Sequence, residues 1–208
     1  MISNNKIYKR VSIGKGGELG DFLIIGIPAE GIKDGQFQTI IGNSSQIRSH
    51  TVIYSANKIG NNFQTGHGVL IREKNQIGDD VSVGSHSTIE HHVKIGNKVR
   101  IHSNTFIPEY TIIKDKVWIG PCVVITNAYH PNSKPKCLKG VTIKSGAIIG
   151  ANVTLLPGII IGDNSFIGAG SVVTQNVPNG EIHVGNPNRK IHDRKELICP
   201  FCKSMPYR

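Results

Sequence analysis

An aliphatic residue recurs at every sixth position through most of this 208-residue chain. Only Thr65 breaks the series that steps by six from Ile41 to Ile125, and the same phase resumes from Ile143 to Val173. An amphipathic helix would space its apolar residues by three and four, so a period of six predicts short strands separated by regular turns. A period repeated about twenty times indicates a solenoid of stacked coils whose aliphatic residues form one continuous core.

Two other recurring positions accompany the aliphatic one. A mostly small or β-branched residue lies four positions after it, as at Val69, Val81 and Val93. Glycine often follows the aliphatic residue directly, at Gly42, Gly60, Gly78, Gly84, Gly96, Gly120, Gly150, Gly162 and Gly168. A glycine repeated at a corner suits a tight turn with an unusual φ angle, and we expect these glycines to adopt one.

The periodicity divides a single fold into three parts. Residues 1–40 carry a looser repeat in another frame and are expected to form an irregular N-terminal cap or first coil. Residues 41–178 are expected to form the β-helix, and residues 126–142, which lose the aliphatic signal and contain two prolines, to project from it as a loop. Residues 179–208 are expected to form a C-terminal cap and tail.

Composition limits the classes of partner. The formal charge of +10 suits an anionic partner, although the basic residues are spread out except between Arg189 and Lys195, as on an ordinary solvated surface. Phosphate-rich ligands are the favoured partners, and nucleic acid is not expected because basic and aromatic residues do not interleave. The sequence has neither a run of about 18 apolar residues nor the layout of a secretory signal, so we expect a cytoplasmic protein without membrane insertion.

The whole pattern resembles the hexapeptide-repeat acyltransferase family. That resemblance implies an all-β fold, a left-handed parallel β-helix with three hexads in each coil, and a homotrimer with sites between subunits. Its left-handedness comes from the resemblance alone, because parallel crossovers in other folds are right-handed. The stretch from Val172 to Gly180, followed by Val184-Gly185-Asn186-Pro187, is very similar to the closing signature of the family.

A coil of three hexads places residues 18 apart on top of one another, about 4.8 Å away. Glu73, His91 and Glu109 then share one column at a corner, beside a column that contains Arg72 and Glu90. A histidine between carboxylates can be oriented by one of them and act as a general base. The alternative is an ordinary solvated corner histidine.

The string from Ile89 to Gly96 also resembles the segment that carries the catalytic histidine in relatives acting on nucleotide-linked sugars. His92 departs from the Asp or Asn that is usual there. We therefore expect His91 to be the base and Glu109 or Glu73 to orient it. His67, at the same place in its hexad, is the competing base.

The resemblance also implies roles in binding. The residues expected at the acceptor are Glu90, Arg72, His102, Asn104 and His130, the last in a loop that reaches toward a neighbouring subunit. The residues expected at CoA are Gly150, Ala151, Gly168 and Ala169 along the pantetheine arm, with Arg189 or Lys190 at the phosphates. No acyl-enzyme is expected, because neither Cys122, taken as buried, nor Cys137 in the loop has an evident basic partner.

The predicted activity is CoA-dependent N-acylation, with acetyl as the acyl group, of a nucleotide-linked amino sugar for surface polysaccharide. O-acetylation of a sugar is the closest alternative. A zinc carbonic anhydrase of the γ class, with His50, His86 and His91 as ligands, is a third reading, and a non-enzymatic solenoid a fourth. Cys199 and Cys202 form half of a zinc site, which Cys137 or histidines would have to complete; free thiols are favoured and no metal is expected.

Overall fold

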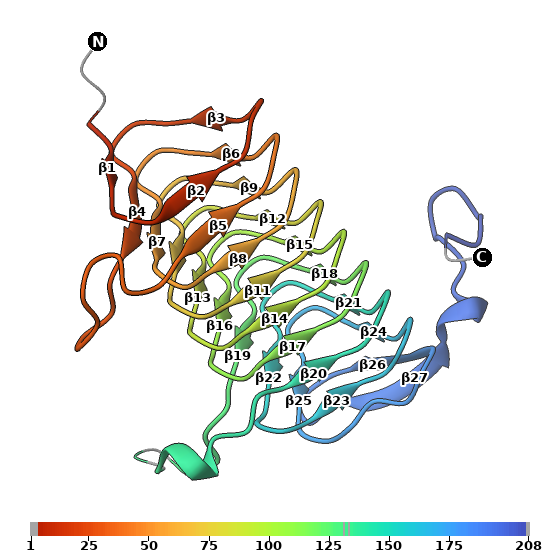
Figure 1. Ribbon diagram of the computed structural model, residues 1–208. Coiled ribbons are helices and arrows are strands. Elements are labelled where there is room, and N and C mark those ends of the chain that lie inside the picture. Colours follow the sequence, from red (N-terminus) through yellow and green to blue (C-terminus); the bar gives the residue numbers. More distant parts are fainter. Residues whose placement is uncertain (1–3, 131, 133, 207–208) are drawn as a thin grey trace.

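Three parallel sheets form the walls of one prism in the computed structural model, which describes residues 4–130, 132 and 134–206 (Figure 1). We name the sheets I, II and III in the order in which the chain enters them. Each coil of the chain adds one strand to sheet I, one to sheet II and one to sheet III before the next coil begins. Leu70 thus pairs with Thr88, and Thr88 with Phe106, at the expected spacing of 18 residues. The prediction of an all-β, left-handed β-helix of hexapeptide repeats is confirmed.

Sheet I has nine strands and sheet II has eight, all of them short. The strands of sheet I are β1 (Lys6–Ile7), β4 (Ile24–Ile27), β7 (Val52–Tyr54), β10 (Leu70–Ile71), β13 (Thr88–Ile89), β16 (Phe106–Ile107), β19 (Val124–Ile125), β22 (Thr154–Leu155) and β25 (Val172–Val173). The strands of sheet II are β2 (Val11–Ile13), β5 (Thr39–Ile41), β8 (Lys58–Ile59), β11 (Gln76–Ile77), β14 (Lys94–Ile95), β17 (Ile112–Ile113), β20 (Thr142–Ile143) and β23 (Ile160–Ile161).

Sheet III has ten strands and ends in an antiparallel pair. They are β3 (Glu18–Leu19), β6 (Gln46–Ile47), β9 (Gln64–Thr65), β12 (Ser82–Val83), β15 (Arg100–Ile101), β18 (Trp118–Ile119), β21 (Ile148–Ile149), β24 (Phe166–Ile167), β26 (Glu181–Val184) and β27 (Arg189–Asp193). Two short 3₁₀ helices, η1 (Pro135–Cys137) and η2 (Arg194–Glu196), complete the regular structure of the described residues. None of its helices is long and apolar enough to span a membrane.

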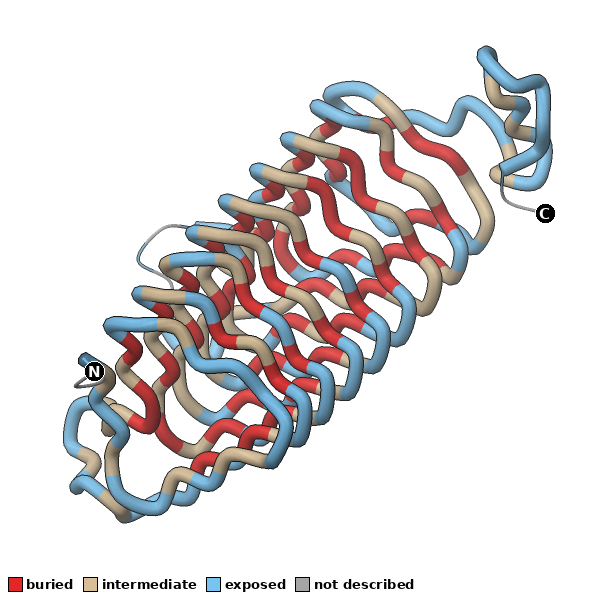
Figure 2. The backbone as a smooth tube through the Cα atoms, turned by 90° about the horizontal axis from the view of Figure 1, so that it is seen from above, coloured by how far each residue is buried: buried red, intermediate tan, exposed pale blue. Residues whose placement is uncertain are grey.

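The aliphatic column fills the interior of the prism, where Figure 2 shows the buried positions facing one another. Ile53, Ile71, Ile89 and Ile107, for example, lie on successive rungs and are fully buried. The one break in the column, Thr65, is also buried, and its Oγ1 accepts a hydrogen bond of 2.9 Å from the backbone N–H of Arg48. The hydroxyl is therefore satisfied inside an apolar core.

The repeated glycines do not supply the unusual φ angle, so that expectation is wrong. Positive φ falls two residues later in the hexad, for example at His92 (58°) and Lys98 (56°). What requires glycine is the close approach of neighbouring rungs. A Cβ atom on Gly120 would lie 2.7 Å from the backbone nitrogen of Ala151 and 2.8 Å from the carbonyl carbon of Gly150.

Amide and carboxylate side chains tie successive rungs together at two corners. At the corner between sheets I and II (corner I/II), the buried Asn75 accepts the N–H of Val93 at 2.7 Å and donates to the carbonyl of Arg72 at 2.8 Å. At the corner between sheets II and III, Asn97 accepts the N–H of Asp79 at 2.9 Å. Corner I/II is therefore held from within, next to the residues expected to do chemistry.

Two insertions interrupt the regular rungs. The first four strands lie within residues 1–40 and already belong to all three sheets. The first insertion lies between β4 and β5, so Ile24 pairs with Val52, 28 residues later. Between β19 and β20 a longer coil pairs Ile113 with Ile143, and the loop that contains η1 projects there from corner I/II (Figure 1). After β27 the tail leaves the prism at its other end, beyond η2 (Figure 1).

Candidate active site

The predicted column at corner I/II is formed. The backbone N–H of His92 bonds the carbonyl of Glu73 on the preceding rung at 3.3 Å. Nε2 of His91 lies 3.7 Å from Oε1 of Glu109 on the following rung. This distance is too long for a hydrogen bond but allows an ion pair when the imidazole is protonated. About a quarter of each of these two side chains is exposed, at 25% and 24%.

The carboxylate of Glu73 is committed to another partner. Nε and Nη2 of Arg72 donate to its two oxygens at 2.9 and 3.2 Å, and Nη1 of Arg72 lies 3.6 Å from Glu90. Partial burial acts to raise the pKa of Glu73, but the hydrogen bonds from Arg72, a backbone hydrogen bond and the charges of Arg72 and His91 together outweigh it, so the pKa lies below its usual value. Burial raises the pKa of Glu90. Glu109 is thus the carboxylate left to interact with His91.

The opposite side of the His91 ring meets a second histidine. Nδ1 of His91 and Nδ1 of His92 are 2.8 Å apart, so one of the two nitrogens carries the proton between them. Burial, followed by the nearby charges of His91 and Lys74, lowers the pKa of His92. The ring of Tyr110 packs edge-on against His91 at 6.0 Å between centroids. The His91 imidazole is therefore held on both sides.

Asn127 extends the column by one further step and was missed in the sequence. Its Nδ2 donates to Oε2 of Glu109 at 2.6 Å, and its carbonyl accepts the N–H of Lys139 at 2.8 Å. The two ends of the projecting loop are therefore joined at the carboxylate that faces His91. The signal was available, because Asn127 lies 18 residues after Glu109. His130 follows within the loop and is exposed.

The competing base lies on a different edge of the prism. His67 is at the corner between sheets III and I (corner III/I), where its Nδ1 lies 2.8 Å from Oγ of Ser49. His102 and Asn104 follow β15 and are at the same corner. Within one chain these three residues are therefore separated from His91, and His67 and His91 cannot serve one site together.

The metal ligand sets considered from the sequence are not assembled within the described residues. His50 and His86 lie at corner III/I and His91 at corner I/II. No group of three or more His, Cys, Asp or Glu residues in the described part of the chain could hold a metal ion. The three histidines could therefore form one set only with a second chain.

The cysteines are accessible. Cys122 is exposed at a corner, contrary to the expectation that it is buried. Cys199 and Cys202 lie in a tight turn in which the N–H of Lys203 bonds the carbonyl of Cys199 at 3.0 Å. A 2.9 Å hydrogen bond with Ser204 is the main cause that lowers the pKa of Cys202 to about 7. Cys137 lies in the projecting loop, far along the chain from this turn.

A groove of about 660 Å³ runs along the outer face of sheet III, and we call it the sheet III groove. Three of the four residues expected along pantetheine, Gly150, Ala151 and Ala169, line it. Three large side chains from successive rungs form its apolar floor, Trp118, Ile148 and Phe166. The fourth residue expected along pantetheine, Gly168, lies beneath β26 instead. A Cβ atom on it would be 2.6 Å from Cγ1 of Val184.

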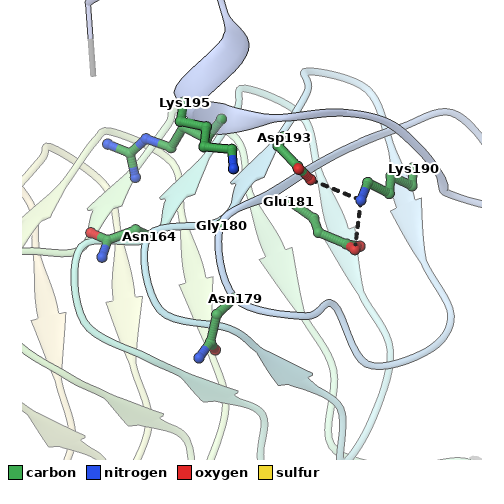
Figure 3. Close-up of a pocket in the computed structure, with 8 residues that line it drawn as sticks. Asn164, Asn179, Gly180, Glu181, Lys190, Asp193 and Lys195 are labelled. Atoms are coloured by element: carbon green, nitrogen blue, oxygen red, sulfur yellow. Dashed lines mark ion pairs between the residues drawn. The ribbon is translucent and has the colours of Figure 1, made fainter. Parts of the chain in front are cut away.

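A polar pocket of about 590 Å³ adjoins the groove, and both are lined by Asn164 and Arg194 (Figure 3). Figure 3 shows Lys190 directed at two carboxylates, Glu181 at 2.9 Å and Asp193 at 2.8 Å. Those two partners raise the pKa of Lys190 and neutralise its charge locally. The other cations at this pocket are Arg194 and Lys195, which lie in the basic stretch 189–195 but were not predicted to meet the phosphates.

Of the two cations predicted to meet phosphates, Lys190 is at the polar pocket and Arg189 is not among the residues that line it or the groove. Arg194 is placed between pocket and groove by a hydrogen bond of 2.7 Å from its Nη1 to the carbonyl of Gly146, 48 residues earlier. No periodicity in the sequence gives this contact, because the tail folds back outside the repeat.

The two candidate parts of the site lie on opposite sides of the prism. Corner I/II joins the walls formed by sheets I and II, so the outer face of sheet III is the wall opposite to it. In Figure 1 the projecting loop accordingly leaves the prism on the side away from β21 and β24. The side chain of His91 cannot reach the sheet III groove of its own chain.

Comparison with known proteins finds a family match in two segments of the repeat. Residues 76–109 and 140–175 match the family described as bacterial transferase hexapeptide, six repeats. A galactoside O-acetyltransferase of Lactococcus lactis subsp. lactis is 40% identical over 86 residues, which are 37% of this chain and 42% of the relative. A 2,3,4,5-tetrahydropyridine-2,6-dicarboxylate N-acetyltransferase of Clostridium perfringens is 32% identical over 89 residues, 39% of this chain and 36% of the relative.

The chain thus spans about two fifths of the length of these curated relatives. Among solved structures, the polySia specific acetyltransferase NeuO aligns with 97% of this chain and 84% of its own, with a TM-score of 0.53 and 20% sequence identity. That likeness concerns the fold.

Proposed function

We propose that this chain, in which residues 76–109 and 140–175 match bacterial transferase hexapeptide repeats, transfers an acetyl group from acetyl-CoA to a sugar. The observation that carries the proposal is that the chain has two features together. One is the histidine–carboxylate pair at corner I/II, and the other is the apolar groove on sheet III, which ends at cations. Acyl transfer needs both parts, because a base must activate the acceptor while the thioester is held beside it.

The sheet III groove is the proposed binding site for the pantetheine arm of acetyl-CoA. Its apolar floor and the close-packed backbone of Gly150 and Ala151 suit the pantetheine arm, as expected from the sequence. We place the phosphates near Arg194 and Lys195, where cations line the adjoining polar pocket. Lys190, whose charge is taken up by two carboxylates, is the weaker candidate for that role.

In the proposed reaction His91 removes the proton of the acceptor as the acceptor attacks the thioester carbonyl. The new bond to carbon forms, the carbon–sulfur bond breaks, and the imidazolium returns its proton to the departing CoA thiolate. Glu109 stabilises the imidazolium, and Asn127 fixes Glu109. Backbone N–H groups would stabilise the oxyanion. No protein nucleophile is required.

The site is proposed to form between chains. Since corner I/II and the sheet III groove lie on opposite sides of one prism, a complete site combines the corner of one subunit with the groove of the next. A cyclic assembly closes such head-to-tail contacts, and the resemblance of the sequence favours a homotrimer. His130, in the loop that leaves corner I/II, would then line the site of the neighbouring subunit.

A sugar hydroxyl is one candidate acceptor atom, since one relative is a galactoside O-acetyltransferase. The amine of a nucleotide-linked amino sugar, predicted from the sequence, is the second candidate. A relative that is an N-acetyltransferase and the charge of +10, which suits nucleotide phosphates, support it.

The test is CoA release from acetyl-CoA and longer acyl-CoAs with galactosides and nucleotide amino sugars as acceptors. Wild type is expected to turn over at least one of these acceptors, and His91→Ala to lower kcat by roughly a hundredfold or more. His86→Ala, which removes an exposed histidine at corner III/I, is the matched control and should lose much less. Full turnover by His91→Ala, with loss in His130→Ala, would transfer the role of base to the loop histidine.

A further inference from the structure

A second cleft lies on the outer face of sheet III, closer to the N-terminus than the sheet III groove. It has a volume of about 250 Å³ and spans the rungs of β6, β9, β12 and β15. Polar side chains dominate its lining, among them Arg48, Gln64, Ser85, Arg100, His102 and Ser103. We call this hollow the arginine cleft.

The two guanidinium groups give the cleft a positive charge. Arg48 and Arg100 are both exposed, and neither forms an ion pair within the described part of the chain. The described residues that line the cleft include no Asp or Glu. Arg72, by contrast, is held between two carboxylates at corner I/II. The charge of the arginine cleft is therefore available to a ligand.

The arginine cleft meets the sheet III groove at His102. The ring of His102 lies 4.7 Å from that of Trp118, and Trp118 lines the groove. Nε2 of His102 is buried and has no hydrogen-bond partner among the described residues. A molecule in the cleft would therefore lie end to end with one in the groove, with the ring of His102 at the junction.

We propose that the arginine cleft binds an acceptor sugar through an anionic group, a carboxylate or a phosphate. Arginine presents a planar fork of donors that matches either group, and serine hydroxyls and the Gln64 amide suit sugar hydroxyls. The volume corresponds to a single sugar unit rather than a drug-sized ligand. This inference rests on the proposed function and adds to it the chemical class of the acceptor.

Binding is tested without turnover by calorimetric titration of the full chain with galacturonate, galactose 1-phosphate and galactose. At least one anionic sugar should bind roughly tenfold or more tightly than galactose, and the tighter anion identifies the group recognised. Arg100→Gln and Arg48→Gln should each weaken that anion's binding by roughly tenfold to a hundredfold. Lys94→Gln, which removes an exposed cation at the equivalent position on sheet II, is the matched control and should change nothing.

Equal binding of galactose and the anions, or unchanged binding of the anions by the Arg48→Gln/Arg100→Gln double variant, would overturn the proposal. CoA release with the same acceptors separates this proposal from the proposed function. Anionic sugars that bind at the arginines without any acetyl transfer would support the cleft and count against the transferase. Acetyl transfer with no preference for anionic acceptors would support the transferase and count against the cleft.

Discussion

At the scale of single residues, the proposed chemistry depends on which carboxylate faces His91. Sequence spacing gives two equivalent candidates, one on the rung above and one on the rung below. The structure separates them, because Arg72 occupies both oxygens of Glu73 while Glu109 lies 3.7 Å from Nε2 of His91. Side-chain pairing within a corner, which spacing does not specify, therefore distinguishes the two.

Glu109→Gln is expected to lower kcat by roughly tenfold to a hundredfold, because the amide cannot stabilise the imidazolium that forms as His91 takes up the proton. The KM for acetyl-CoA should stay unchanged, since Glu109 contacts His91 and Asn127 and none of the residues proposed to bind CoA. Steady-state kinetics with Glu73→Gln as the matched control measures the difference. Equal losses of kcat in the two variants would contradict the assignment.

His102 makes stability depend on pH. Burial and then the charge of Arg100 lower the pKa of His102 in the folded chain, so the unfolded chain binds the proton more readily. Its contribution to stability is present above about pH 6.5, the unperturbed pKa, and is lost as the pH falls through the lower folded pKa. His102→Gln should therefore reduce the fall in Tm between about pH 7 and about pH 5. Thermal unfolding that shows the same fall in both proteins would contradict this.

At the scale of elements, each two-residue strand depends on the turns that stack it. Asn75 is buried at the base of corner I/II and bonds the backbones of two rungs, whereas the similar Asn97 is exposed. Losing Asn75 would leave buried backbone groups unpaired. Because Asn75 donates to the carbonyl of Arg72, these bonds also link core packing to the placement of Arg72.

Asn75→Ala should therefore lower the free energy of unfolding by about 1–3 kcal/mol. Asn97→Ala removes a comparable bond at an exposed corner, where water can replace it, and should cost less than about 1 kcal/mol. Chemical denaturation of both variants measures the contrast. A smaller loss for Asn75→Ala than for Asn97→Ala would show that the buried hydrogen bonds of Asn75 do not stabilise corner I/II.

The elements also show what the sequence could and could not predict. The six-residue period predicts the strands and the columns, because every rung repeats the same inward position. It would also have found Asn127, one coil after Glu109 in the same column. Arg194 could not be found in this way, because η2 lies outside the repeat and reaches Gly146 through the folding of the tail. The prediction that the repeated glycines adopt an unusual φ angle was wrong. Contact between neighbouring rungs, rather than the turn itself, excludes a side chain at these positions.

At the scale of the whole molecule, the three-walled prism separates base and groove. The spacing of residues in the sequence cannot reveal how a complete site forms. It predicts which residues share a corner of one chain, but not which wall of one subunit meets which corner of another. Two defective chains should therefore compensate each other, one lacking the base and the other having a blocked groove. Ala169→Trp, at an exposed position that lines the sheet III groove, supplies the second defect.

Mixing His91→Ala with Ala169→Trp chains and measuring acetyl transfer tests the central claim most directly. If each site joins the corner of one subunit to the groove of the next, about a quarter of the sites in a randomly mixed cyclic assembly are intact, and activity should return toward that level. The separate variants should stay inactive. Mixed assemblies that contain both chains, verified by mass, and still show no transfer would contradict a site shared between subunits.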